Sequence, residues 1–246
     1  MKGAASDGGK TRVLDLKRKG PRGVEEIAAT NDLKSAWMVE EFYPGRGAGA
    51  TDPPEDTEYP NPLWTYEALT EQQLHQVIQK MKPWKGTRLG TFPNCVYKFG
   101  ASLLVPRLQK IFRALDVYQH EPPDWQRTET IVARKPGKPD YSLVNAHRPI
   151  ILSHGHARLR NAGKTLQVAT NAEFFGMLPS NHYGGRPGRT GVDMVQGKVA
   201  TLLLRDVKGA FASAMLSRVV HNMRMAGVPR EHTDWMMRRF TGRAAL

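Results

Sequence analysis

The chain has one cysteine, Cys95, in 246 residues. A single thiol forms no intramolecular disulfide and cannot build a zinc site from several thiolates, so both kinds of scaffold are excluded. This cysteine usage indicates a reducing compartment. No histidine stands at a spacing from Cys95 that is typical of a thiol nucleophile, and we expect a small buried side chain there.

Long hydrophobic runs are also absent. The most apolar stretches, such as residues 199–204, are far shorter than the roughly 20 residues that span a membrane. The first twelve residues, MKGAASDGGKTR, lack the apolar core of a secretory signal. The sequence contains no Walker-type phosphate loop and no nucleophile elbow. We therefore expect no membrane partner.

Positive charge is what the chain has in excess. Its 36 Lys and Arg residues outnumber 23 Asp and Glu residues, which gives a net charge of +13 and a pI near 10.0. Basic side chains that neutralise phosphates release bound counterions, so this excess favours an RNA or DNA partner. A well-solvated basic surface without such a partner would have the same composition.

The first half of the chain predicts a loose segment followed by helices. Residues 1–62 are rich in Gly, Pro and acidic residues, and we expect them to be largely disordered apart from one short helix at 32–42. Residues 63–127 form a predicted helical region. There, Thr70 and Gln73 make a capping box, in which each side chain satisfies the other's backbone N–H, and helical apolar spacing follows.

Strand patterns begin with the alternating, β-branched segment TETIVAR at residues 128–134. A basic turn follows over residues 135–139, and a second apolar strand is predicted over residues 199–204. Further helices are expected over residues 102–117, 213–226 and 232–240. With these helices and strands together, we expect an α+β fold.

Asp206 follows the predicted strand at 199–204. A carboxylate at the end of a rigid apolar strand suits a hard divalent cation such as Mg²⁺. Two-metal phosphoryl transfer needs several carboxylates around ions roughly 3.5–4 Å apart, and one aspartate cannot hold both. An aspartate at this place is equally compatible with a cap of the turn into the next helix.

Two basic loops are candidate phosphate sites. Arg186 and Arg189 stand three residues apart in the segment NHYGGRPGRT, where backbone N–H groups and guanidinium groups can meet a phosphate. Lys135 and Lys138 lie in a turn that could hold a template backbone. An ordinary exposed turn is the alternative reading of both loops.

The segment His154-Gly155-His156 offers two imidazoles. The sequence places no third ligand near them, so we expect no metal site there. The five tryptophans are scattered along the chain, and we interpret them as packing residues rather than as a row that stacks on bases.

Four blocks follow one another along the chain: PNCVYKFGASLLVPRLQKIFRA, PPDWQRTETIVARKPGKPDYSLVNAHRPI, LPSNHYGGRPGRTGVDM and KVATLLLRDVKGAF. In this order they resemble the reverse transcriptases of fungal-type non-LTR retrotransposons, from about residue 33 to residue 242. The resemblance implies RNA-templated DNA synthesis, with a template–primer and dNTPs as partners, Mg²⁺ as cofactor, and a nuclear or cytoplasmic place of action.

The fold that the resemblance implies is a right-hand polymerase. Its fingers would span residues 128–196, and its palm would begin in residues 197–246. Asp206 would be the first metal-binding and catalytic aspartate of the palm. Phe211 would be the bulky residue that screens the sugar 2′-position.

The resemblance also gives the basic residues a role. Arg148 and Arg186 match positions in the fingers where cationic groups approach the incoming triphosphate or the template, and Arg189 belongs to the same loop as Arg186. Lys135 and Lys138 would contact nucleic acid. Such sites act mainly by positioning and by neutralising charge.

Three departures separate this sequence from the family. Residues 153–176 lack the apolar periodicity of the family's helix, and we expect them to be the least regular part of the second half. Only a few residues separate Asp193 from Lys198, where the family carries a full helix. No aromatic-x-Asp-Asp block follows Asp206. We therefore expect a truncated, partly degenerate domain that is inactive by itself.

Three hypotheses stay open at this point. The chain is a reverse-transcriptase remnant, or a non-enzymatic basic protein that binds nucleic acid, or a chain without a stable fold. The third follows if the palm strand lacks partner strands, because its backbone groups would then be unpaired.

Overall fold

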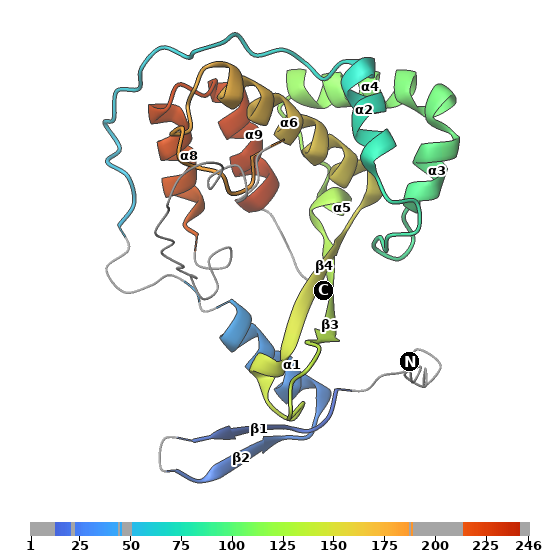
Figure 1. The fold of residues 1–246 in the computed structure, drawn as a ribbon, viewed down its shortest axis with the longest axis vertical. Helices are drawn as coiled ribbons and strands as arrows, with labels where there is room; N and C mark the ends of the chain where they lie inside the picture. The colour runs from blue at the N-terminus through green and yellow to red at the C-terminus, as the bar shows by residue number, and fades with distance from the viewer. Residues whose placement is uncertain are drawn as a thin grey trace, which may run out of the picture. The chain divides into compact units, whose positions relative to one another are not determined.

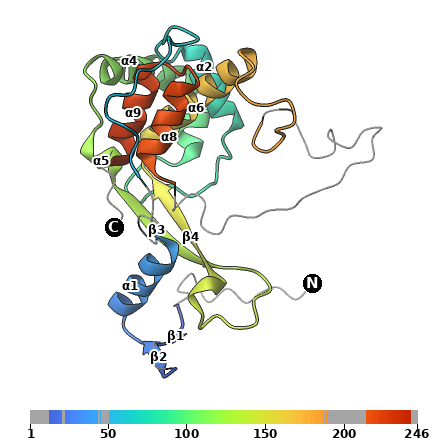
Figure 2. The same ribbon diagram turned by 90° about the vertical axis from the view of Figure 1, so that its left-hand side faces the viewer.

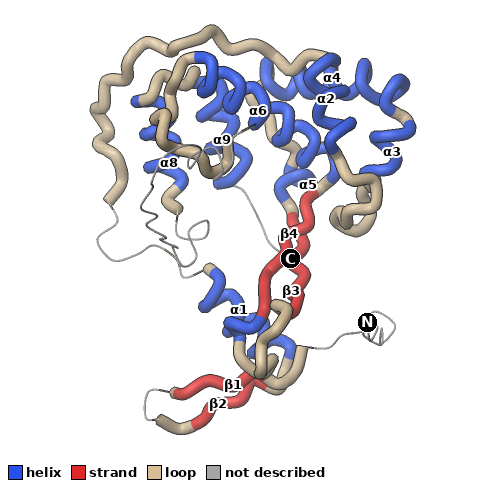
Figure 3. The backbone as a smooth tube through the Cα atoms, in the orientation of Figure 1, coloured by secondary structure: helices blue, strands red, loops and turns tan. Residues whose placement is uncertain are grey.

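The computed structural model describes residues 13–20, 23–43, 45, 51–186, 188 and 214–241. Helices and strands both occur in them, which confirms the α+β class (Figure 3). The chain divides into two compact units. Of the described residues, those before residue 51 and those at 130–151 belong to the smaller unit, and the others belong to the larger unit. The predicted strand at 199–204 lies outside the described residues.

The smaller unit contains a hairpin, a helix and most of a two-stranded ribbon. Its elements are β1 (Leu16–Lys19), β2 (Glu25–Ala28), α1 (Asn31–Phe42), β3 (Thr128–Arg134), the 3-10 turn at Val144–Ala146 and β4 (His147–Ser153). The boundary between the units falls inside β3 and β4. The predicted helix at 32–42 and the predicted strand at 128–134 are both confirmed.

Residues 16–19 and 25–28, which we expected to be disordered, pair as the antiparallel strands of a hairpin (Figure 1). The prediction of disorder was wrong because the strand sequences LKRK and EEIA lack the alternation of apolar and polar residues by which strands are recognised. Opposite charges replace it: Lys17 pairs with Glu25 at 3.2 Å and Arg18 with Glu26 at 2.7 Å across the strands. Such cross-strand pairs fix the register.

The core of the smaller unit is small. Its buried members are Leu16, Ala28, Trp37 and Met38. The side chain of Thr30 caps α1 by accepting from the N–H of Leu33, which places Trp37 and Met38 over the hairpin end. Val132 and Val144 pack against the same cluster from the ribbon and its connection.

The larger unit is helical. Its helices are α2 (Glu71–Lys80), α3 (Asn94–Phe99), α4 (Ala101–Val117), α5 (Pro123–Gln126), α6 (Gly155–Phe174), α8 (Leu216–Met225) and α9 (Arg230–Thr241). The predicted capping box is confirmed: the Thr70 N–H donates to Gln73 Oε1 at 3.1 Å, and the Gln73 N–H donates to Thr70 Oγ1 at 3.2 Å. The predicted helices at 102–117, 213–226 and 232–240 correspond to α4, α8 and α9.

The apolar core of this unit lies among α2, α4 and α6. Leu74 and Ile78 from α2 meet Leu108 and Phe112 from α4, and all four are buried. Helix α6 approaches closely because residue 163 is glycine. A Cβ atom there would lie 2.8 Å from the Leu69 side chain, so a larger residue would require that side chain or α6 to shift.

The expectation for residues 153–176 is wrong. They contain α6, which at 20 residues is longer than any other helix in the described part of the chain. The buried residues of α6 recur at helical spacing, but several of them are polar or charged rather than apolar. Arg160, Lys164 and Gln167 are buried at spacings of four and three residues, so they share one face. A search for apolar periodicity does not detect such a helix.

Acidic residues from other elements meet this polar face. Asp116 of α4 accepts from Arg160 Nη2 at 2.7 Å and from Lys164 Nζ at 2.9 Å. Glu121 pairs with Arg160 and lies 3.6 Å from Arg239 Nε of α9. Three buried cations therefore face the buried carboxylate of Glu121 and the partly buried carboxylate of Asp116, and these pairs join α4, α6 and α9. We call these five residues the ionic core.

Helices α8 and α9 lie side by side (Figure 1, Figure 2). Gly227, between them, has φ of +85° and donates to Arg224 O, so it ends α8 in a conformation that glycine tolerates best. The Leu63 N–H donates to Gly227 O at 2.8 Å. This bond holds the extended segment before α2 against the helix pair. No helix in the described ranges is long and apolar enough to span a membrane.

We expect Asp116→Ala to destabilise the protein by about 3–5 kcal/mol, because it leaves Arg160 and Lys164 buried without their shared carboxylate. Urea unfolding followed by far-UV circular dichroism measures the change. The exposed Asp56→Ala is the matched control, and we expect it to change the free energy of unfolding by no more than about 0.5 kcal/mol. Equal effects of the two variants would show that the ionic core does not stabilise the fold.

Candidate functional site

The connection between β3 and β4 is a turn that its own side chains hold in shape. Asp140 accepts from the Ser142 N–H at 2.7 Å and from Ser142 Oγ at 2.9 Å. The Tyr141 hydroxyl donates to Lys135 O at 2.9 Å. Gly137, with φ of +74°, makes the reversal. The basic residues of this segment therefore stand on a defined backbone.

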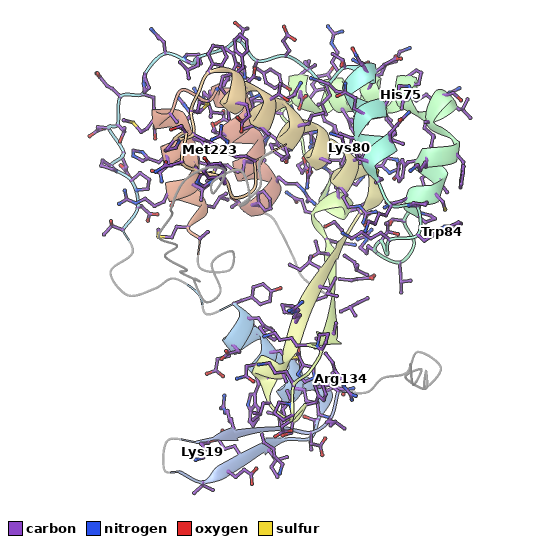
Figure 4. All side chains as sticks on the ribbon, viewed as in Figure 1. Lys19, His75, Lys80, Trp84, Arg134 and Met223 are labelled. Carbon is purple, nitrogen blue, oxygen red and sulfur yellow. The ribbon has the colours of Figure 1, made fainter. Side chains whose placement is uncertain are left out.

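The cations of the ribbon differ in their freedom. Lys135 Nζ donates to Asn145 O at 2.7 Å, so one of the three N–H donors of this ammonium is already bonded within the turn. Lys138 and Arg148 are exposed, and so is Arg134, whose guanidinium carbon lies 5.1 Å from the centre of the Tyr141 ring (Figure 4). An arginine over an aromatic ring keeps its charge and is held in place. Sequence reasoning had not singled out Arg134.

Arg186 is already occupied. Its Nε and Nη2 atoms each lie 2.6 Å from the carboxylate oxygens of Glu173, and Nη1 donates to the carbonyl oxygens of Pro179 and His182. A two-pronged ion pair of this kind fixes the guanidinium plane. Arg186 thus ties the loop after α6 back to that helix, and a triphosphate would have to displace Glu173 to reach it.

The other predicted site residues cannot be placed. Asp206, Arg189 and Phe211 lie outside the described residues. Arg148 belongs to the smaller unit and Arg186 to the larger one. The Mg²⁺ site and the sugar-screening residue that the resemblance implies therefore stay predictions.

His154 and His156 are packed into an aromatic cluster. Their ring centres are 5.1 Å apart, and Trp125 stacks on His154 at 5.7 Å. His156 Nδ1 shares a hydrogen bond of 2.8 Å with the Tyr97 hydroxyl. Burial lowers the pKa of His156 to about 4, and the neighbouring His154 contributes to this shift. A neutral imidazole that bonds a tyrosine is a packing group here.

The ionic core is the place where titrating groups are most concentrated, and sequence reasoning missed it. Lys164 Nζ contacts the Tyr66 hydroxyl and Asp116. Burial lowers the pKa of Lys164 to about 8 against the attraction of Asp116. Burial alone would raise the pKa of Asp116, but Lys164, Tyr66 and Arg160 together hold it below its usual value.

A lysine with a lowered pKa beside a tyrosine can move protons in an accessible site. Here Lys164 is fully buried, so its ammonium has no room for a substrate. Burial is the main cause of the lowered pKa, and the positive charges of Arg160 and Arg238 add to it. We interpret this cluster as a structural element. The sequence did contain a signal for this cluster. Arg160 and Lys164 are four residues apart, so they lie on one face of a helix, and the acids Asp116 and Glu121 precede that helix in the chain.

Metal binding finds no support in the described parts of the chain, where no three His, Cys, Asp or Glu side chains are grouped so that they could hold an ion. No protein-family model matches the chain, and a search of curated proteins finds no relative.

Protein stability should fall as the pH drops from about 6.5 to about 4. Burial, with a smaller effect of Lys164, lowers the pKa of His232 to about 4. Because the folded state excludes the proton that the unfolded state binds, the stabilisation is complete above the unfolded pKa and is lost as the pH falls through this window. A shift of this size corresponds to about 3 kcal/mol.

Urea unfolding at pH 4.5 and 7.0 measures this dependence. His232→Phe should weaken it by roughly half, because the pKa of the buried His156 is lowered to about 4 as well. His120→Phe, which changes an exposed imidazole, should leave it intact. The fold does not depend on a neutral His232 if both variants lose stability in acid as the wild type does.

Proposed function

We propose that this chain is part of a reverse-transcriptase domain of the fungal non-LTR type, with fingers and the beginning of a palm, and that it binds nucleic acid through the β3–β4 ribbon. These 246 residues do not synthesise DNA by themselves. The four ordered sequence blocks carry the proposal. The geometry of the second block, which contains the ribbon, supports it.

The ribbon has the features of a phosphate-binding element. Arg134, Lys138 and Arg148 are exposed on a turn and two strands, and the turn is fixed by Asp140 and Tyr141. Cations on a fixed turn bind a phosphate backbone without first losing loop freedom, and the Tyr141 ring also holds the Arg134 side chain. They contact the backbone rather than the bases, so they would hold a template of any sequence.

Two cations of the neighbouring hairpin in the smaller unit are paired with carboxylates. On β1, Lys17 and Arg18 pair with Glu25, Glu26 and Glu40. Paired cations gain little from a phosphate because they must give up a carboxylate. Among the described residues of this unit, Arg134, Lys138 and Arg148 are therefore better placed than Lys17 and Arg18 to meet an anionic strand.

Catalysis would require more than this sequence contains. The resemblance assigns one metal-binding aspartate, Asp206, and no aromatic-x-Asp-Asp block follows it in the 246 residues. In two-metal transfer, one carboxylate does not hold both ions in place. Template-dependent extension of a primer by the purified chain, with RNA template, dNTPs and Mg²⁺, would contradict this part of the proposal.

We expect the triple variant Arg134→Gln, Lys138→Gln, Arg148→Gln to bind a fluorescein-labelled RNA template–primer about tenfold more weakly or worse at low salt. The slope of log K against log salt should fall by about 0.7 for each single-strand phosphate that the variant no longer neutralises. Fluorescence anisotropy over a salt series measures both quantities.

The matched control is Lys17→Gln, Arg18→Gln, Lys19→Gln, which removes the same charge from β1. We expect little change, since glutamates already neutralise two of these cations. If both triple variants weaken binding equally, net charge and not the ribbon governs it.

A protein that binds nucleic acid without any polymerase ancestry is the second candidate, and the net charge of +13 favours it. The two candidate functions predict different preferences among nucleic-acid substrates. Polymerase fingers hold a template next to a primer duplex, so a recessed template–primer should bind more tightly than either strand or duplex alone. Equal affinity for all three would favour the second candidate.

A further inference from the structure

The segment from residue 72 to residue 115 has no acidic residue but eight Lys and Arg residues. It runs from α2 through the loop at residues 81–93 and α3 to α4. Seven of the eight cations are exposed: Lys80, Lys82, Lys85, Lys98, Arg107, Lys110 and Arg113. The basic excess of the larger unit is therefore concentrated on these elements.

Large apolar side chains project from the same loop. Trp84 and Leu89 are each 81% exposed, and Trp84 projects from the loop between α2 and α3 (Figure 4). Exposing a tryptophan to this extent forgoes most of the stabilisation that its burial would give. Lys82 and Lys85 flank it in the sequence, so an aromatic face stands between two cations.

The loop is held in place although its tip is exposed. Asn94 Nδ2 donates to Lys82 O at 2.8 Å, and Arg158 Nη1 donates to Gly86 O at 3.0 Å. Lys98 Nζ donates to Met81 O at 3.3 Å. These three side chains come from α3 and α6 and fix the backbone on both sides of Trp84.

The acidic groups near the loop are already engaged. Among the described residues, Asp124 and Glu129 are the carboxylates with hydrogen bonds to it. Asp124 takes both its bonds from Arg88 Nη2, at 2.7 and 2.8 Å, and Glu129 accepts from the Leu89 N–H at 3.2 Å. Both carboxylates anchor the loop, and Arg88 neutralises the charge of Asp124.

We infer that the loop at residues 81–93 is a second nucleic-acid contact, at which Trp84 stacks on an unpaired base while Lys82 and Lys85 neutralise the adjoining phosphates. The inference rests on the proposed function only in taking nucleic acid as the partner, because it concerns the larger unit and not the ribbon. Every base has a π-face, so such a contact is independent of sequence. A single strand is required, since bases inside a duplex are already stacked.

An acidic protein surface is the competing partner for a basic, apolar loop. The observations favour a single strand because the exposed side chain at the centre is a planar aromatic flanked by cations on a fixed backbone. A protein partner would give no dependence on whether a base is free to stack.

The test uses the whole 246-residue chain and a fluorescein-labelled 12-nucleotide oligo(U), with fluorescence anisotropy at low salt. Trp84→Ala should weaken binding about fivefold or more, and Trp84→Phe should stay within about twofold of the wild type because it keeps a ring. Lys82→Gln with Lys85→Gln should lower the salt slope by about 1.4. A blunt 12-base-pair duplex should bind wild type and Trp84→Ala alike.

Phe174→Ala is the matched control. Phe174 is also 81% exposed and belongs to the same unit, but residues 165–185 contain no Lys or Arg. It should leave oligo(U) binding unchanged. Far-UV circular dichroism and a thermal melt show that each variant is folded.

The outcomes separate this inference from the proposed function. If Trp84→Ala binds oligo(U) as the wild type does while the ribbon triple variant does not, the loop contact is wrong and the ribbon stands. If Trp84→Ala weakens binding and the ribbon variant does not, the loop contact stands and the ribbon is wrong. Absence of any binding by the wild type overturns both, and equal weakening by Trp84→Ala and Phe174→Ala overturns the loop contact.

Discussion

Asp116 is the point on which the packing of the larger unit depends. Its carboxylate accepts from Arg160 and Lys164 of α6 and from the Tyr66 hydroxyl, and Glu121 continues the chain of pairs to Arg239 of α9. Taking charges out of water costs several kcal/mol per ion, and good pairing offsets this cost. Helices α4, α6 and α9 therefore hold one relative arrangement, because any other leaves a buried charge without its partner.

The ionic core also explains how a helix can exist without an apolar stripe. Helix α6 buries Leu159 and presents glycine to Leu69, which gives close contact on one side. Arg160, Lys164 and Gln167 fill the remaining inward positions. At those positions ion pairs and hydrogen bonds replace apolar contacts. Burial also lowers the pKa of His232 and of Lys164, which is why we expect the stability of the protein to depend on pH.

The cations of this protein fall into two groups with different roles. Arg160, Lys164, Arg186 and Arg239 are buried against carboxylates and belong to the fold. Arg134, Lys138 and Arg148 on the ribbon, and the lysines around Trp84, are exposed and can meet phosphates. Net charge counts both groups alike. The proposed nucleic-acid contacts rest on the second group, and both are built on backbone that internal hydrogen bonds hold in position.

Local signals in the sequence were enough for the elements that depend on neighbouring residues. The capping box at Thr70 and Gln73, the strand at 128–134 and the helices at 102–117 and 232–240 follow from spacing and caps, which act over a few residues. The ordered blocks indicated the family that we propose. Only the tertiary structure decided which basic residues are buried. Arg186 and Lys164 look like Arg148 and Lys138 in the sequence, and what distinguishes them is a carboxylate brought in from another part of the chain. The same holds for the pairing of β1 with β2 and for α6, because both are stabilised by charge pairs whose partners the periodicity of a single segment does not reveal.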